Sequence, residues 1–329
     1  MIKSETPKTI IFIGSGAIAT SLGNILAAKP ENHVVLLSIE NEVVDAINQE
    51  HTNSKYFPNF KLHTDLKATG NKEILKQADM IFLAIPSVAI VGYLRANLAY
   101  ISPDAVLVNL AKGFGNEFQL IPDCVNTFMT NVMASMKGPS FARDIINGQP
   151  TGFTIASTDA SCFPIFGEVF SKTIIHLDYS VDVQGVEYAS ILKNIYAIVI
   201  GIVDANFDSP NLRSLVLTKA INEMRSLILR FGGKSETMFN YCGFGDFSLT
   251  ALNDLSRNRT LGLLIGKGFF TKDISEKVVL EGRIATNVFY EQLSKSIDVN
   301  AEYRLMSELY AVFNKDCDIK GFVDRILQD

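Results

Sequence analysis

The chain has 329 residues, of which 47% are hydrophobic and 20% are charged, and its formal net charge is −5. This length predicts two domains, and the composition is that of a globular protein. The acidic balance gives no reason to expect a nucleic-acid partner, because nucleic acids are usually bound by a basic surface.

No segment is expected to span a membrane or to bind a metal. The longest apolar run, at residues 195–203, falls well short of the roughly 20 residues needed to cross a bilayer. The apolar stretch at residues 10–13 ends at glycines, which is typical of a strand and not of a signal peptide. The four cysteines and four histidines have no ligand-like spacing. We therefore expect no metal and a reducing, cytoplasmic location.

Residues 1–182 alternate short apolar runs with helix-like stretches, such as residues 18–29 and 42–49. This rhythm predicts an α/β domain with a Rossmann-like, doubly wound, mostly parallel sheet and helices on both faces. The seven predicted strands are residues 9–13, 34–39, 80–84, 105–109, 132–137, 151–156 and 173–177.

After about residue 181 the strand pattern disappears. Residues 187–203 and 212–231, and several shorter stretches after them, have helical spacing. We therefore predict an all-helical C-terminal domain at residues 183–329, which follows the α/β domain at residues 1–182.

The first strand leads directly into a glycine pair and a helix, which is the arrangement of a dinucleotide-binding turn. Gly14 allows a tight turn, Gly16 removes a side chain that would block a pyrophosphate, and Ala19 lets the helix pack closely on the sheet. The amides at the helix N-terminus are suited to bind phosphate. A purely structural tight turn is the alternative.

The end of the second predicted strand bears on which dinucleotide binds. Glu40 stands there with no cation nearby in the sequence. A carboxylate at this place hydrogen-bonds ribose hydroxyls and repels a 2′-phosphate. The sequence therefore predicts NAD in preference to NADP, although NADP is possible.

Lys193 lies in a helix that is apolar nearly all round. Burial moves the pKa of an ammonium toward neutrality, where it can exchange a proton. The alternative is that the side chain extends along the helix surface to reach water.

Two further motifs in the helical half favour a small phosphorylated substrate. Asp246 follows a glycine-flanked turn and could hold and orient Lys193. Ser256, Arg257 and Asn258 form a serine-capped helix start with a cation, which suits a phosphate.

These motifs, in this order, resemble the NAD(P)-dependent glycerol-3-phosphate dehydrogenases, particularly the bacterial type, over most of the chain. The matching positions are Ile47, Asn48, His51, Asn53, Tyr56, Pro58, Ala78, Asp79, Ile85, Pro86, Ser87, Lys112, Gly113, residues 138–142, Lys193, Asn194, residues 243–250, residues 256–259, Val279, Glu281 and Gly282.

The resemblance implies reversible hydride transfer between NAD(P)H and dihydroxyacetone phosphate, giving sn-glycerol 3-phosphate for phospholipid synthesis, by a homodimer. It implies that Lys193 is the general acid/base and that Lys112 touches both cofactor and substrate. Other positions that match substrate-binding residues are Gly138, Ser140, Asp246, Ser256, Arg257 and Asn258. Positions that match cofactor-contacting residues are Ser15, Ile18, Ala142, Val279 and Glu281, with Lys112 and Arg257 shared by both.

The chain departs from the family pattern at four places. Ile18 and Ala19 replace an aromatic residue and a glycine, and Glu40 stands where NADP-using members have arginine. Phe114 and Gly115 replace isoleucine and glutamate, and residues 206–210 replace a glycine-rich loop. These departures concern cofactor preference and loop behaviour, since none removes a predicted catalytic group.

Two alternatives stay open. A related dehydrogenase of another small acid, such as a ketopantoate- or opine-type substrate, would not need the phosphate site at Arg257 and Asn258. A non-catalytic dinucleotide sensor would keep the fold and bind NADH without turnover.

Overall fold

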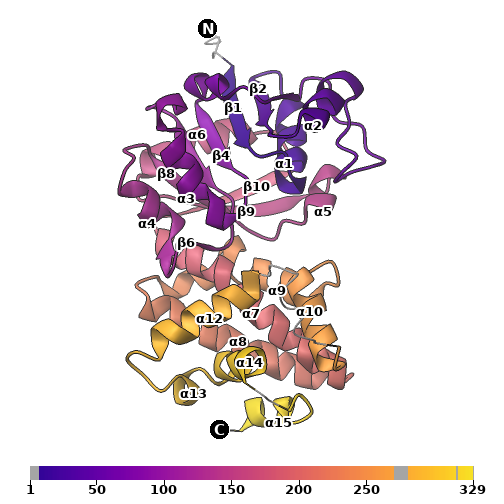
Figure 1. Ribbon diagram of the computed structural model, residues 1–329, viewed down its shortest axis with the longest axis vertical. Helices are drawn as coiled ribbons and strands as arrows, with labels where there is room; N and C mark the ends of the chain where they lie inside the picture. The colour runs from indigo at the N-terminus through magenta and orange to yellow at the C-terminus, as the bar shows by residue number, and fades with distance from the viewer. Residues whose placement is uncertain (1–6, 270–280, 316–317, 329) are drawn as a thin grey trace. The chain divides into compact units, whose positions relative to one another are not determined.

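The computed structural model describes residues 7–269, 281–315 and 318–328, and the chain divides into two compact units (Figure 1). One unit comprises Met1–Ala111 and Gln119–Val183. The other comprises Lys112–Phe118 and Gln184–Asp329. Residues 112–118 therefore group with the helical unit, although they lie inside the predicted first domain.

The first unit is built on an eight-stranded sheet with strand order β10-β9-β8-β5-β4-β1-β2-β3. All neighbouring strands run parallel except β8 and β9, which are antiparallel. The sheet strands are β1 (Lys8–Ile13), β2 (Asn32–Leu37), β3 (Lys67–Thr69), β4 (Met80–Leu83), β5 (Val106–Asn109), β8 (Met133–Lys137), β9 (Thr151–Ala156) and β10 (Ile175–Ser180); two short strands, β6 (Phe114–Asn116) and β7 (Gln119–Leu120), lie outside it. The predicted mostly parallel sheet is confirmed. The sequence missed β3, a three-residue edge strand with no apolar run.

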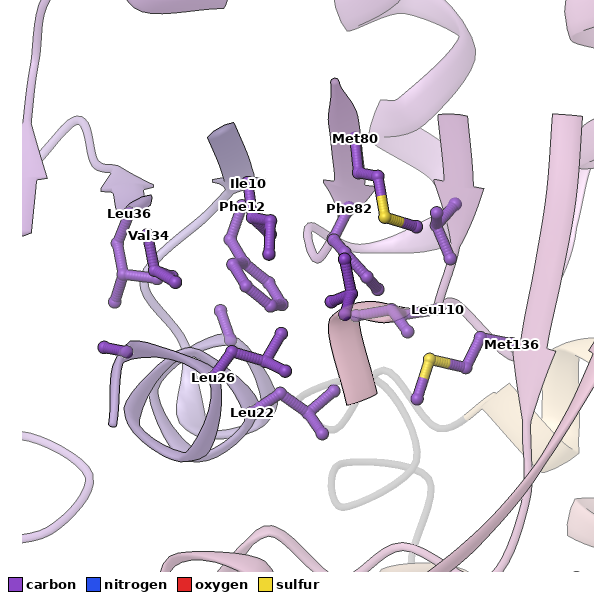
Figure 2. Close-up of a cluster of buried hydrophobic side chains, with 14 of the residues drawn as sticks. Ile10, Phe12, Leu22, Leu26, Val34, Leu36, Met80, Phe82, Leu110 and Met136 are labelled. Atoms are coloured by element: carbon purple, nitrogen blue, oxygen red, sulfur yellow. The ribbon is translucent and has the colours of Figure 1, made fainter. Parts of the chain in front are cut away.

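Both faces of this sheet are buried. In β1, Ile10 and Phe12 lie in one hydrophobic cluster, whereas Ile11 and Ile13 lie in the other. Because strand side chains alternate between faces, a strand covered on both sides needs a continuous apolar run. Figure 2 shows Phe12 beside Phe82 of β4, and the two rings stack with centroids 4.6 Å apart.

Helices cover the two faces as a doubly wound sheet requires. Helices α1, α5 and α6 contribute buried residues to the cluster with Phe12, and Leu22 and Leu26 of α1 point into it (Figure 2). Helices α3 and α4 contribute to the opposite cluster. The helices of this unit are α1 (Ala17–Ala27), α2 (Asn41–Asp45), α3 (Ser87–Ala96), α4 (Ile121–Asn126), α5 (Ala142–Ile146) and α6 (Phe163–Phe170).

The second unit is mainly helical. Its helices are α7 (Val183–Asn206), α8 (Pro210–Arg230), α9 (Asp246–Leu252), α10 (Arg257–Gly266), α12 (Glu281–Leu293), α13 (Val299–Glu302), α14 (Arg304–Asn314) and α15 (Phe322–Leu327). Helix α7 has the length and hydropathy of a membrane span, yet its most apolar window is entirely buried. Burial of this kind is typical of the core helix of a globular unit.

Helices α7 and α10 pack unusually closely. A Cβ atom added at Gly201 would lie 2.3 Å from the carbonyl oxygen of Arg259, and one at Gly262 would lie 2.1 Å from that of Ile198. Glycine is therefore required on both sides of this contact. The close approach brings the start of α10 beside the polar residues of α7.

Candidate active site

The turn after β1 depends on two glycines for different reasons. Gly14 has φ +112°, in the left-handed region, and a Cβ atom there would lie 2.7 Å from the carbonyl oxygen of Ala84. A Cβ atom at Gly16, which precedes α1, would meet nothing within 4 Å. Packing of the chain itself therefore does not require glycine at position 16, whereas the close approach of a pyrophosphate would.

Polar side chains behind the turn hold its shape. The hydroxyl groups of Ser15 and Ser38 lie 2.8 Å apart. Asn53 Nδ2 donates to the carbonyl oxygen of Ser15 (3.0 Å) and to Thr20 Oγ1 (2.9 Å). Asn53 therefore ties the glycine turn to the first turn of α1, which keeps the backbone amides there in a fixed arrangement.

A cavity of about 610 Å³ opens at the carboxyl ends of β1, β2 and β4. This is the usual position of a ligand site in an open α/β sheet. Among the predicted cofactor residues, those that line the cavity are Gly14, Ser15, Gly16 and Glu40. Ile18 and Ala142 do not line it, and both are partly buried against the sheet core instead.

The surroundings of Glu40 differ from the sequence-based expectation. Lys55 Nζ donates to both carboxylate oxygens of Glu40, at 2.7 and 2.9 Å. The expectation that no cation is near Glu40 is therefore wrong, because the chain folds back and brings a lysine from fifteen positions further on. With Lys55 bound to it, Glu40 repels a 2′-phosphate less than an isolated carboxylate would.

The predicted substrate residues Gly138 and Ser140 follow β8. Ser140 Oγ donates to the carbonyl oxygen of Gly138 at 2.9 Å. A Cβ atom at Gly138 would lie 2.3 Å from the carbonyl oxygen of Gly152, so this glycine also allows the chain to pass close to β9. Gly138 thus has a packing role of its own.

In the helical unit, two lysines share one buried carboxylate. Lys193 Nζ of α7 lies 2.6 Å from Asp246 Oδ1, and Lys112 Nζ lies 2.7 Å from Asp246 Oδ2. Asp246 is the first residue of α9 and is 1% exposed. Thr250, one turn further along α9, accepts a hydrogen bond from Lys193 Nζ at 2.7 Å and donates to the carbonyl oxygen of Asp246.

This arrangement gives Lys193 unusual acidity. Burial lowers the pKa of the Lys193 ammonium to about 8, because a charged form is disfavoured away from water. The carboxylate of Asp246 opposes this shift, and the neighbouring Lys112 ammonium adds to it. Lys193 is therefore buried and paired, and the alternative in which its side chain extends to water is excluded.

Beside this cluster, the start of α10 presents polar groups with unused hydrogen-bonding capacity. Ser256 caps the helix, with its hydroxyl oxygen accepting from the amide of Arg259 at 3.3 Å. Asn258 Nδ2 donates to Asn194 Oδ1 of α7 at 3.0 Å. Asn258 Oδ1 and Asn194 Nδ2 are buried, and neither has a hydrogen-bond partner among the described residues. Buried polar atoms of this kind usually meet a ligand or water.

Arg257, in the first turn of α10, is exposed. Its neighbour Arg259 is buried and donates to Asp204 Oδ2 of α7 (2.5 Å) and to the carbonyl oxygen of Ala251 (3.0 Å). Arg259 therefore fixes the helix start, while Arg257 is left accessible to an anion.

The last two predicted cofactor residues are described only in part. Val279 lies outside the described residues. Glu281 is the first residue of α12 and is half-buried, and the next residue, Gly282, lies against Asn258 and the backbone of Asn194. The start of α12 is therefore next to the polar group at the start of α10.

Comparisons with known proteins agree with this geometry. Residues 9–163 match the model of the NAD-dependent glycerol-3-phosphate dehydrogenase N-terminus, and residues 182–324 match that of the C-terminus. A glycerol-3-phosphate dehydrogenase [NAD(P)+] of Leptospira biflexa is 33% identical over 96% of both chains. The chain belongs to the NAD(P)-dependent glycerol-3-phosphate dehydrogenase family.

Two further relatives extend the match. The glycerol-3-phosphate dehydrogenase [NAD(P)+] of Methanothermobacter thermautotrophicus is 36% identical over 78% of this chain and 80% of its own. The crystal structure of glycerol-3-phosphate dehydrogenase from Coxiella burnetii superposes with a TM-score of 0.88 at 28% identity, covering 98% of this chain and 100% of that one. The similarity to the family thus extends over both units.

The residues of this glycerol-3-phosphate dehydrogenase family member fit the nicotinamide dinucleotide that the family uses. Gly16 leaves open space at the N-terminus of α1, where helix amides attract phosphate. The cavity next to it continues to Glu40 at the end of β2, which could accept bonds from ribose hydroxyls. The glycine turn thus fits a bound dinucleotide, and the purely structural alternative does not explain Gly16.

Sequence reasoning assigned no role to three polar residues, Thr250, Asn194 and Lys137. Thr250 stands four positions after Asp246, so helical spacing could have revealed it. Asn194 was noted as the neighbour of Lys193 and as a position that matches the family. Lys137, the last residue of β8, is fully buried, and its ammonium donates to the carbonyl oxygens of Asn109 (3.2 Å) and Ala111. A lysine ending an apolar strand gives no sequence signal of burial.

Proposed function

We propose that this protein reduces dihydroxyacetone phosphate reversibly to sn-glycerol 3-phosphate, with NADH preferred to NADPH as the hydride donor. The observation that carries the proposal is the buried cluster of Lys193, Asp246 and Thr250. Beside it lie amide atoms of Asn194 and Asn258 for which the described part of the chain offers no hydrogen-bond partner. The cluster suits proton transfer, and the neighbouring helix start suits a phosphate.

The phosphate end of the substrate would bind at the start of α10. Arg257 supplies an accessible cation, Ser256 caps the helix, and the helix N-terminus adds partial positive charge. Binding energy from this remote group holds the substrate carbonyl in a reactive orientation. Gly138 and Ser140 are further substrate contacts in the proposal.

Lys193 would hold the proton that the carbonyl oxygen gains on reduction. A reduced nicotinamide, when bound, would supply the hydride that the carbonyl carbon gains. As negative charge develops on the oxygen, the Lys193 ammonium transfers its proton there, and Lys112 stabilises that charge. Asp246 keeps both ammonium groups in place. In the reverse direction, neutral Lys193 accepts the alcohol proton.

Cofactor binding in the proposal uses the turn at Gly14, Ser15 and Gly16 together with Glu40. The remaining proposed cofactor contacts are Ile18, Lys112, Ala142, Arg257, Val279 and Glu281. We further propose that residues 1–182 and 183–329 act as the dinucleotide and substrate domains of a cytoplasmic homodimer that supplies phospholipid synthesis. Light scattering of the purified protein tests the dimer.

The test of the reaction follows NADH absorbance after addition of dihydroxyacetone phosphate, dihydroxyacetone or ketopantoate. We expect rapid oxidation of NADH only with dihydroxyacetone phosphate. Arg257→Ala should lower kcat/KM by about 10–100-fold, as expected for losing one charged hydrogen-bonding group. Arg225→Ala, which removes an exposed arginine of α8, is the matched control and should change little. NADH binding without turnover of any substrate would contradict the proposal and favour a sensor.

A further inference from the structure

Two charged side chains line the cavity at the ends of β2 and β3, and a third is bound to one of them. Glu40 and Lys72 both line the cavity. Lys55 does not line it, but its ammonium is bound to both oxygens of Glu40. The cavity rim therefore combines one carboxylate with two lysines, where the sequence suggested a carboxylate alone.

Aromatic rings beside both lysines restrict where their ammonium groups lie. Lys55 Nζ lies 5.7 Å from the ring centroid of Tyr56, and Lys72 Nζ lies 5.9 Å from that of Tyr93. Both rings belong to residues that line the same cavity. Each cation is thus held close to the cavity by a ring that forms part of its wall.

The ion pair between Lys55 and Glu40 is exposed to water, with side chains 52% and 43% exposed. Exposed pairs of this kind contribute little to folding stability, so an incoming anion can replace the carboxylate at small cost. A phosphate monoester is such an anion, because it offers up to two negative charges and three acceptor oxygens.

We propose that Lys55 and Lys72 form a subsite for the 2′-phosphate of NADPH, and that Glu40 competes with this phosphate for Lys55. With NADH, Glu40 remains paired with Lys55 and accepts bonds from the ribose hydroxyls. With NADPH, the phosphate takes the place of the carboxylate on Lys55. The proposal rests on the proposed function, since it needs a dinucleotide in this cavity.

The proposal explains how one chain serves both cofactors without an arginine after β2. NADH is favoured because the carboxylate must be displaced before the 2′-phosphate can bind. NADPH is still accepted because two cations stay at the rim. The competing interpretation is that Lys55 only orients Glu40 for ribose binding, in which case its loss would weaken NADH binding most.

The experiment measures binding of NADH and NADPH by fluorescence titration, and kcat/KM for both with saturating dihydroxyacetone phosphate. The variants are Lys55→Met, Lys72→Met, the double variant and Glu40→Gln. Lys61→Met is the matched control, since it removes an exposed lysine that does not line the cavity. All are surface changes that leave the buried clusters intact.

We expect the double variant to bind NADPH at least about tenfold more weakly, while NADH binding changes less than about twofold, in line with the loss of two charged contacts. Glu40→Gln should strengthen NADPH binding and weaken NADH binding. Equal losses for both cofactors in the double variant, or no loss, would overturn the subsite. Absence of turnover with dihydroxyacetone phosphate would overturn the reaction instead, and the titrations would still test the subsite.

Discussion

Lys193 Nζ lies 2.6 Å from Asp246 Oδ1 in a part of the helical unit where both side chains are buried. Removing either partner of such a pair leaves an uncompensated charge, which is why buried pairs are sensitive to single substitutions. The second oxygen of the same carboxylate holds Lys112. A single aspartate therefore positions both lysines to which the proposed reaction assigns roles.

Replacing Lys193 by methionine should abolish most turnover. The change keeps the volume and apolar stem of the side chain but removes the proton donor, and general acid catalysis contributes about 10²–10⁴-fold. We expect kcat to fall by that range while the dissociation constant for NADH, measured by fluorescence titration, stays within about twofold. Near-normal turnover would remove Lys193 from the mechanism.

The rate of ketone reduction should fall as pH rises through about 8, the pKa to which burial lowers Lys193. Reduction needs the protonated amine, which is lost above this pH, whereas oxidation of glycerol 3-phosphate needs the neutral amine and should rise over the same range. Stopped-flow traces of a single turnover at a series of pH values measure the pH dependence of the rate in both directions. In Asp246→Asn the fall in the rate of reduction should move to lower pH, because Asp246 raises the pKa of Lys193. An unchanged pH dependence of the rate in this variant would contradict the role of Lys193 as the proton donor.

The sequence identified the elements whose signals are local. A glycine turn after an apolar strand, a lysine in an apolar helix and a capped helix start all depend on neighbouring residues. The pairing of Lys193 with Asp246 was expected from the glycine-flanked turn before Asp246 and the capped helix start that follows it. The other features of the fold and the site depend on contacts between residues that lie far apart in the chain.

Three features could not be predicted from local sequence patterns. Lys55 reaches Glu40 only because residues 46–58 fold back to the end of β2. Residues 112–118 give no local signal that they belong with the helical half, yet Phe114 and Phe118 pack with Phe289 of α12 in the helical unit. Ile18 and Ala142 are matched to the family by position alone, and their packing against the sheet core gives no independent support.

Lys137 should act as a positioning residue for Lys112. Its buried ammonium donates to the carbonyl oxygen of Ala111, and the amide of Ala111 is itself held by Asn109 Oδ1 at 3.0 Å. Ala111, the residue directly before Lys112, is therefore held at both its amide and its carbonyl oxygen. Lys137→Met should lower kcat by about 5–50-fold, since misplacing a catalytic group by about 1 Å can cost 10²-fold.

The Lys137 prediction is checked by comparing kcat, KM and the urea midpoint in Lys137→Met and Lys137→Arg. Methionine leaves the carbonyl oxygens of Asn109 and Ala111 without this donor, which costs about 1–3 kcal/mol of stability. We therefore expect a lower midpoint in the methionine variant together with a fall in the kcat of the protein that stays folded, and partial recovery of both in the arginine variant. A loss of stability with unchanged kcat in the remaining folded protein would make Lys137 purely structural.

Glu223 of α8 should make folding stability depend on pH. Its carboxyl group accepts from the amides of Leu305 (2.8 Å) and Met306 (3.3 Å) and from the hydroxyl of Tyr196 (3.0 Å). Burial outweighs these bonds and raises the pKa of Glu223 to about 7. A raised carboxyl pKa means that the folded state binds the proton more tightly than the unfolded chain.

The contribution of Glu223 is therefore fully present below the unfolded pKa of 4.5 and is lost as pH rises through about 7. The loss is on the order of 3 kcal/mol for a shift of this size. The test measures the free energy of unfolding in urea at a series of pH values. The value for the wild type minus that for Glu223→Gln should fall as pH rises, because glutamine does not titrate. Glu302→Gln, at the partly exposed end of the neighbouring α13, is the control and should keep the wild-type slope. A pH-independent difference between wild type and Glu223→Gln would show that the carboxyl group ionises equally easily in the folded and unfolded states.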